Sequence, residues 1–323
     1  MPSPQAPWVV IARCAKESGG GKRASEPLPS LASHSHLSPP FSHHLADYAA
    51  LAALAAIAIL TEHAAPFIRP IYAGPDGKAD EELWRYSYPL VARSSQRVPA
   101  WAVPTISFSI PLALLVLHRV LFGCSRLEFH ASLLSLLSAI FAVGAATNTL
   151  KISVARPRPN FVARCWPHGG APVFDAAGIA VCAPDAISPL EGRKSFPSGH
   201  TSWSAAGLGW ASFWLAGRLR VWDRDAAGHP WRLCVAAAPI VLVVFIGVSR
   251  LQDSWHHPTD VMAGGALGLG LAYLFFRQTF HCFSGARAGE AYAGGGGGGG
   301  GEASEGGEGG ALAGGGGPDA LGV

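Results

Sequence analysis

Six apolar segments, most of them close to the length that crosses a membrane, constrain this chain more than any other feature of its sequence. They cover residues 46–61, 100–122, 129–150, 201–219, 233–249 and 259–277. A helix needs about 20 mostly apolar residues to span the hydrocarbon core of a bilayer. Only 14% of the 323 residues are Asp, Glu, Lys or Arg, against about 25% in a typical soluble protein. We therefore expect an all-α integral membrane protein with about six transmembrane helices.

The first segment is the weakest of the six. It is rich in alanine and meets Glu62 and His63, so it is either short or continues to Phe67 with two polar residues near its end. The alternative for every segment is a buried helix of a large soluble all-α protein. Six such segments in a chain with so little charge favour the membrane.

The two ends of the chain have a different composition. Residues 1–44 are rich in Ser, Pro and His and lack the apolar core of a signal peptide, which predicts a disordered N-terminal extension, with a transit peptide as the alternative. Residues 281–323 contain an unbroken glycine run from Gly294 to Gly301. Such a sequence cannot bury a core and predicts a Gly-rich disordered tail. The six-span domain is predicted to occupy residues 45–280.

Charge and cysteine content limit the partners. The net charge is only +3, and the basic residues lie beside apolar segments, a pattern that suits lipid headgroups better than nucleic acid. The six cysteines show no metal-binding spacing. Cys165 and Cys182 share one connection, where they form either a disulfide, if it faces a lumen or the outside, or two free thiols.

An even number of spans places both ends of the chain on one side of the membrane. The 62–99, 151–200 and 250–258 connections then share the other side. Lys and Arg are equally numerous on the two sides, so the positive-inside rule leaves the absolute orientation open. Setting aside the three cations treated below as functional favours cytosolic termini.

A first polar cluster lies where the third apolar segment ends. It reads Lys151-Ile-Ser-Val-Ala-Arg-Pro-Arg158-Pro159. One interpretation is a basic anchor at the membrane surface, followed by a proline-stiffened exit from the helix. The other is that Lys151 and Arg158 converge on an anion, the guanidinium gripping two phosphate oxygens.

A second cluster, Pro197-Ser198-Gly199-His200, stands directly before the fourth apolar segment. A turn that feeds a helix directs unpaired backbone N–H groups and the positive end of the helix dipole at what lies in front, which predicts a phosphate seat. The alternative is a Ser-capped helix start with an incidental histidine.

A third cluster joins the fifth and sixth segments and contains Arg250, His256, His257 and Asp260. Pro258 suits the first turn of a helix, which puts Asp260 near the helix N-terminus. Asp260 can then bind one nitrogen of His256 and leave the other free to act as a nucleophile. The alternative, an interfacial Trp-His-His group, gives no reason for charged residues at a membrane edge, where charge is costly.

Taken together, the clusters resemble the three-part phosphatase signature of the type-2 phosphatidic acid phosphatase superfamily. The matching patterns are Lys151-x6-Arg158-Pro159, Pro197-Ser198-Gly199-His200 and Ser249-Arg250-x5-His256-x3-Asp260. The resemblance extends from about Tyr72 to Phe276, and its flanking segments are similar to plant-type lipid phosphate phosphatases in particular.

The resemblance implies a membrane enzyme, with its catalytic site at one membrane face, that hydrolyses phosphatidic acid, and also lysophosphatidic acid and diacylglycerol pyrophosphate, without a metal or other cofactor. His256 would attack phosphorus to give a phosphohistidine, His200 would protonate the leaving oxygen and then activate water, and Asp260 would hold His256. The phosphate would be bound by Lys151, Arg158, Ser198, Gly199 and Arg250. No cluster of carboxylates stands there to hold Mg²⁺.

Several alternatives share the signature. Phosphatases for polyprenyl diphosphate, sphingosine phosphate or glucose 6-phosphate have the same core pattern, and some members bind lipid without catalysis. Vanadium-dependent haloperoxidases share the site but are soluble. The expected location is the endoplasmic reticulum or plasma membrane, with the plastid envelope as an alternative. The preferred lipid and the oligomeric state stay open.

Overall fold

The computed structural model describes residues 44–71, 81–169, 172–222, 229–283 and 287–292. The predicted N-terminal extension, apart from its last residue, and most of the predicted Gly-rich tail lie outside the described residues. The packed part of the chain reaches further than the predicted boundary at residue 280. Phe280 pairs with Ala291 in an antiparallel bridge, and Ala288 is buried.

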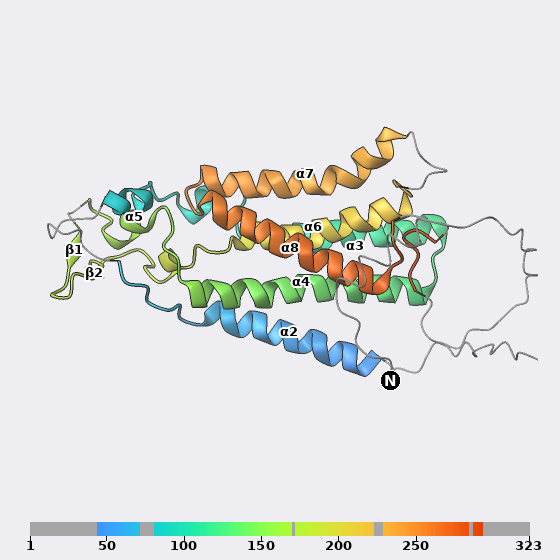
Figure 1. Cartoon of the computed structure of the whole chain (residues 1–323), viewed down its shortest axis with the longest axis horizontal. Coiled ribbons are helices and arrows are strands. Elements are labelled where there is room, and N and C mark those ends of the chain that lie inside the picture. The colour runs from blue at the N-terminus through green and yellow to red at the C-terminus, as the bar shows by residue number, and fades with distance from the viewer. Residues whose placement is uncertain (1–43, 72–80, 170–171, 223–228, 284–286, 293–323) are drawn as a thin grey trace, which may run out of the picture. The chain divides into compact units, whose positions relative to one another are not determined.

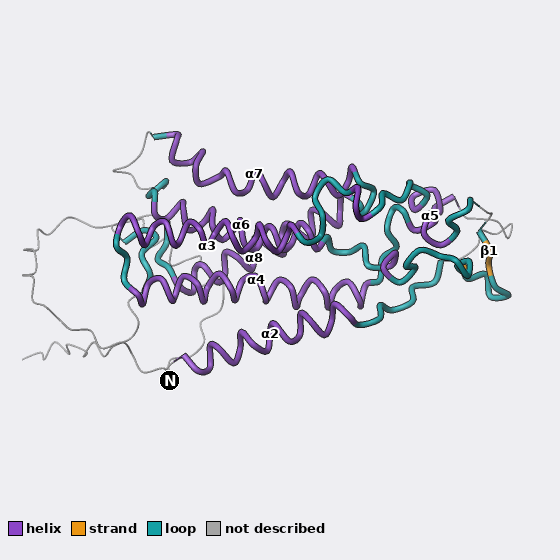
Figure 2. The backbone as a smooth tube through the Cα atoms, turned by 180° about the vertical axis from the view of Figure 1, so that it is seen from behind, coloured by secondary structure: helices purple, strands orange, loops and turns teal. Residues whose placement is uncertain are grey.

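The described chain is all-α apart from one small hairpin, as predicted. Six long helices run alongside one another (Figure 1): α2 (Leu45–His63), α3 (Ala102–Phe122), α4 (Arg126–Val154), α6 (Gly199–Arg218), α7 (Pro230–Gln252) and α8 (Pro258–Thr279). The connections at one end of these helices carry the short elements, as seen from behind in Figure 2. They are α5 (Phe161–Cys165), the antiparallel strands β1 (Val173–Phe174) and β2 (Ala180–Val181), and 3-10 turns at Glu81–Tyr86, Arg93–Ser95 and Glu191–Arg193.

Five of the six long helices are long and apolar enough to cross a membrane: α2, α3, α4, α7 and α8. Helix α6, which corresponds to the predicted fourth span, does not meet that criterion because serine and glycine interrupt its apolar residues. Its position explains the difference. It packs against α3, α4, α7 and α8, so most of its surface contacts other helices. That surface does not need to be apolar as a lipid-facing surface does.

Small residues let the helices around α6 approach closely. A Cβ atom at Gly207 of α6 would lie 1.9 Å from the Ser107 carbonyl oxygen of α3, and one at Gly268 of α8 would lie 2.4 Å from the Ser202 carbonyl oxygen of α6. Both distances are far inside van der Waals contact. Close approach through small residues is a common way for membrane helices to associate, because lipid provides no hydrophobic drive between them.

The long 155–198 connection is fixed to itself and to the helix ends. Cys165 and Cys182 are joined by a disulfide with a Cα–Cα distance of 4.5 Å, so of the two alternatives the structure has the bonded one. Lys194 donates to the Glu62 and Ala64 carbonyl oxygens at 3.0 Å each. These contacts cap the end of α2 and hold the connection against it.

We predict that Gly268→Ala destabilises the protein whereas Gly270→Ala, two residues along the same helix, does not. A Cβ at Gly270 meets nothing within 4 Å, and replacing a helical glycine by alanine there is expected to be neutral or to stabilise by up to about 1 kcal/mol. Overpacking at Gly268 is expected to cost roughly 1–3 kcal/mol. Thermal unfolding in detergent measures both, and equal midpoints for the two variants would contradict the packing described.

Candidate active site

All eight predicted site residues come together at the end of the helices that carries α5 and the strands. Each cluster lies at a helix boundary there: α4 ends, α6 begins, and α7 gives way to α8. Five predicted residues line one cavity of about 440 Å³: Lys151, Arg158, Gly199, His200 and His256. The other three, Ser198, Arg250 and Asp260, are fully buried and do not line it.

The start of α6 is built by Ser198. Its hydroxyl oxygen is the N-cap and accepts from the backbone N–H of Thr201 at 3.4 Å and from the Thr201 hydroxyl at 3.0 Å. This hydroxyl therefore supports the helix end rather than facing the cavity. At Gly199 a Cβ would lie 2.8 Å from Lys151 Nζ, so a glycine here lets the lysine ammonium lie against the first turn of α6.

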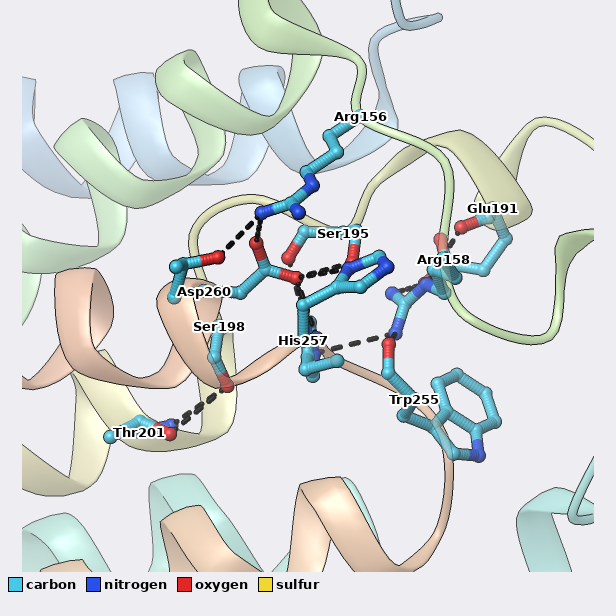
Figure 3. Close-up of polar contacts among 11 residues, drawn as sticks. Arg156, Arg158, Glu191, Ser195, Ser198, Thr201, Trp255, His257 and Asp260 are labelled. Carbon is cyan, nitrogen blue, oxygen red and sulfur yellow. Dashed lines mark hydrogen bonds and ion pairs between the residues drawn. The ribbon is translucent and has the colours of Figure 1, made fainter. Parts of the chain in front are cut away.

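The cations of the site differ in their partners. Arg158 donates through Nη2 to Glu191 Oε1 at 2.5 Å and through Nε to the Glu191 carbonyl oxygen at 2.9 Å, as Figure 3 shows. Arg250 donates through Nη2 to Asp253 at 2.9 Å. Within the described part of the chain, the ammonium of Lys151 makes no hydrogen bond or ion pair. It is left free for an anion in the cavity.

His200 lies between the cavity and Arg250. Its Nε2 is 3.3 Å from Arg250 Nη1. Since a guanidinium only donates, this nitrogen accepts, and a neutral His200 carries its proton on Nδ1. The same Nη1 donates to Gln96 Oε1 at 2.9 Å, so the side chain of Arg250 is fixed from two sides.

The ring of His256 is oriented mainly by a backbone group. Nδ1 is 2.7 Å from the Ser195 carbonyl oxygen, which can only accept, so Nδ1 carries the proton and Nε2 is the unprotonated, accepting nitrogen. Arg158 Nη1 lies 3.4 Å from that Nε2. Asp260 Oδ2 is 3.8 Å from Nδ1, too far for a hydrogen bond. The expectation that Asp260 binds this nitrogen directly is therefore corrected: the Ser195 carbonyl does so.

Asp260 instead joins the three clusters (Figure 3). Its Oδ2 accepts from the Ser195 hydroxyl at 2.6 Å and the His257 backbone N–H at 2.9 Å, and its Oδ1 accepts from Arg156 Nη1 at 2.7 Å. Its own carbonyl oxygen accepts from the Ser198 N–H at 3.0 Å. One buried carboxylate thus fixes the relative positions of the segments leaving α4, entering α6 and entering α8.

Sequence reasoning missed three of these residues. Arg156 lies inside the first polar cluster, where a second cation beside Arg158 could have indicated a carboxylate partner, and Ser195 lies two residues before the second cluster. Nothing in the sequence singles out Glu191. His257, the neighbour most easily confused with the nucleophile, does not line the cavity, and its Nδ1 is 3.2 Å from Asp260.

Burial shifts the ionisation of the site. It lowers the pKa of His256 to about 4, an effect that Asp260 opposes and Arg158 reinforces. Burial lowers the pKa of Arg158 as well. Burial alone would raise the pKa of Glu191, but Arg158 and the other cations hold it below its ordinary value. His256 is thus neutral, and available as a nucleophile, across the physiological range.

The fold and the site together define a multi-pass integral membrane protein that has, at one end of its helices, a cavity lined by the cations Lys151 and Arg158 and by the histidines His200 and His256. A family model described as the PAP2 superfamily matches residues 132–284. Lipid phosphate phosphatase 1 of Arabidopsis thaliana is 37% identical over 239 residues, 74% of this chain and 69% of that protein. The chain belongs to the PAP2 superfamily, as its three-part pattern predicts.

Two further proteins are similar to this chain. Diacylglycerol pyrophosphate phosphatase 1 of Saccharomyces cerevisiae is 37% identical over 181 residues, which are 54% of this chain and 61% of that protein. A solved transmembrane PAP2-type phosphatidylglycerolphosphate phosphatase from Bacillus subtilis is 20% identical, with a TM-score of 0.34, and the match covers 73% of this chain and 93% of that one.

We predict that the imidazole of His256 stays neutral from pH 7.5 down to about pH 5. Burial depresses the pKa of His256 to about 4, so folding favours the neutral imidazole. The folded state therefore loses stability as the pH falls from the ordinary pKa near 6.5 towards 4, because only the unfolded chain binds the proton in that range. Nitrogen NMR of histidine-labelled protein measures the titration, and a His256→Asn variant assigns the signal. A midpoint near 6.5 would contradict the burial described.

Proposed function

We propose that the protein is a metal-independent lipid phosphate phosphatase that hydrolyses phosphatidic acid to diacylglycerol and phosphate. Its relatives' names support lipid phosphates as substrates. The observation that carries the proposal is that one cavity has both a cationic, histidine-bearing end and an apolar wall. The apolar wall comes from the membrane helices and includes Ala55 and Ile59 of α2, Val103 and Pro104 of α3, and Phe141 of α4.

The length of the cavity suits a lipid. Phe141 precedes Lys151 by ten residues on α4, which is roughly 15 Å along a helix axis. A phosphate held at Lys151 would therefore leave an attached acyl chain beside apolar side chains in the hydrocarbon region. A small soluble phosphate ester would gain nothing from that wall, which favours a lipid over a sugar phosphate.

In the proposed reaction His256 Nε2 attacks phosphorus, an N–P bond forms, and the bond from phosphorus to the glycerol oxygen breaks. His200 gives a proton to that departing oxygen and then takes one from water, which attacks phosphorus and breaks the N–P bond. The negative charge of the bound phosphate favours the protonated His200 that the first step needs. In that form Nε2 no longer accepts from Arg250, so this hydrogen bond breaks when His200 is protonated. Lys151 and Arg158 stabilise the charge that spreads over the phosphoryl oxygens.

No metal has a role in this proposal. Among the described residues no group of three His, Cys, Asp or Glu side chains is arranged to hold an ion. Three of the carboxylates near the cavity are paired with arginines: Glu191 with Arg158, Asp253 with Arg250, and Asp260 with Arg156. A fourth, Glu62, lines the cavity. The three pairings hold the cations in place for the phosphate.

The active-site face is proposed to lie toward a lumen or the cell exterior. The Cys165–Cys182 disulfide lies in the connection at that face, and disulfides persist in oxidising compartments. This agrees with cytosolic termini and with a place in the endoplasmic reticulum or plasma membrane.

The first test is phosphate release from detergent-dispersed phosphatidic acid in the presence of EDTA. Wild type is expected to be active, and His256→Ala to lose at least about 10³-fold, because the nucleophile is gone. His257→Ala is the matched control and is expected to keep readily measurable activity. Full activity of His256→Ala, or loss of wild-type activity in EDTA that added Mg²⁺ restores, would contradict the proposal.

A second test addresses Asp260 through its neighbour. Ser195→Ala removes the hydroxyl that donates to Asp260 at 2.6 Å but keeps the carbonyl that binds His256. We expect kcat to fall about tenfold, since a hydrogen bond to a charged group contributes about 1.5–3 kcal/mol. Ser153→Ala, at an exposed serine of α4, is the control. An unchanged kcat in Ser195→Ala would show that this bond does not support the reaction.

A further inference from the structure

The indole of Trp255 has the guanidinium groups of two arginines over its ring. The Cζ atom of Arg158 is 4.7 Å from the ring centroid (Figure 3), and the Cζ atom of Arg164, in α5, is 4.6 Å from it. All three side chains are buried. Trp255 and Arg158 line the cavity, whereas Arg164 does not. An arginine outside the three-part signature is thus connected to the phosphate end of the cavity through one aromatic ring.

Arg164 has few groups that compensate its charge. Its Nε donates to Asn160 Oδ1 at 2.8 Å and its Nη1 to the Ile187 carbonyl oxygen at 3.5 Å. Within the described segments it forms no ion pair with a carboxylate, and its Nη2 makes no hydrogen bond. Burial, and after it the charge of Arg158, lowers the pKa of Arg164 to about 10, so it is still a cation at neutral pH. The negative face of the Trp255 indole therefore contributes to stabilising a buried positive charge.

The position of the Trp255 ring is fixed by three hydrogen bonds. Its backbone N–H donates to the Arg250 carbonyl oxygen at 3.0 Å, and its carbonyl oxygen accepts from Arg158 Nη1 at 3.3 Å. The indole Nε1 donates to the Val91 carbonyl oxygen at 3.3 Å. With Arg164 also against the ring, these contacts keep the indole beside the guanidinium of Arg158.

Arg158 needs such a neighbour because its own hydrogen bonds do not fix it completely. Glu191 accepts from Nε and Nη2, which lie along one edge of the guanidinium. A group held along one edge can still tilt about that edge. A planar guanidinium grips two phosphate oxygens only when its plane is correctly oriented. The Trp255 ring lies where it limits this tilt.

We propose that Trp255 is a positioning residue, which together with Arg164 holds the guanidinium of Arg158 in the orientation that binds the transferring phosphoryl group. This rests on the proposed function, in which Arg158 stabilises the charge on the phosphoryl oxygens. Neither Trp255 nor Arg164 bonds to the reacting atoms. Without the ring the charge of Arg158 stays in the site but its orientation is no longer fixed, so stabilisation of the transition state is lost.

The first test is a double-mutant cycle between Trp255 and Arg158. Trp255→Leu is expected to lower kcat/KM for phosphatidic acid about tenfold, the size expected for a buried cation–π contact. Trp255→Phe keeps an aromatic ring and is expected to recover most of that loss. In an Arg158→Lys background the further loss from Trp255→Leu is expected to be below about twofold, because the planar group is gone. An equal loss in both backgrounds would show that Trp255 acts on its neighbour His256 or on stability alone, and would overturn the proposal.

Arg164 is tested in the same way, with a matched control. Arg164→Gln is expected to give about the same loss as Trp255→Leu, and the two together no more than either alone. If Arg164→Gln does not fold, the cycle between Trp255 and Arg158 decides the proposal. Trp231→Leu is the control, because Trp231 also has an arginine, Arg232, over its ring, at 5.7 Å, but is exposed and does not line the cavity. It is expected to leave kcat/KM unchanged. Additive losses from Arg164→Gln and Trp255→Leu would contradict the proposal.

A binding measurement separates this inference from the proposed function. Orthovanadate, which can adopt the five-coordinate geometry of a transferring phosphoryl group, is expected to raise the unfolding temperature of the purified wild-type chain. The concentration that gives half of this shift should rise about tenfold in Trp255→Leu and stay unchanged in Trp231→Leu. If wild type binds vanadate but hydrolyses no lipid, the proposed function fails and the shift still decides the role of Trp255. An unchanged concentration in Trp255→Leu, or no shift in wild type, overturns that role.

Discussion

The structure of the site depends on one buried carboxylate, Asp260. It accepts from Arg156 after α4, from Ser195 before α6 and from the backbone at the start of α8. A buried charge of this kind is costly unless it is fully paired. Removing any one of these partners would break one of the bonds that fix the three segments relative to one another. Three segments that are far apart in the sequence are thereby held around a single cavity.

The bilayer accounts for where these charges lie. Charged side chains are expensive inside the hydrocarbon region, and the functional ones here lie at helix boundaries, where connections and helix ends supply hydrogen-bond partners. Helix α6 begins in the site and passes through the middle of the other helices. Its serines and glycines are tolerated because protein surrounds them, and the glycines let α3 and α8 approach its backbone.

The sequence predicts the helices and the site residues well, for different physical reasons. Each membrane-spanning helix must itself be apolar over the width of the bilayer, so the sequence alone locates these helices. Helix α6 is the exception because it is more polar. Lys151, Arg158, His200 and His256 lie in local patterns beside helix ends and do line one cavity. The pairings between segments could not be predicted. The Ser195 carbonyl that orients His256 is a backbone group with no residue signature, and Glu191 reaches the site only through the tertiary path of its connection.

The central claim is that His256 is the nucleophile of a metal-independent lipid phosphatase. The most direct measurement is a rapid quench in alkali, where a phosphoramidate survives, with lipid labelled at the phosphate, followed by mass spectrometry of the labelled peptide. The account predicts a transient phosphoryl group on the peptide that contains His256, formed in EDTA and absent from His256→Ala. A phosphoryl group on another residue, or turnover of the lipid in His256→Ala without any labelled intermediate, would contradict it.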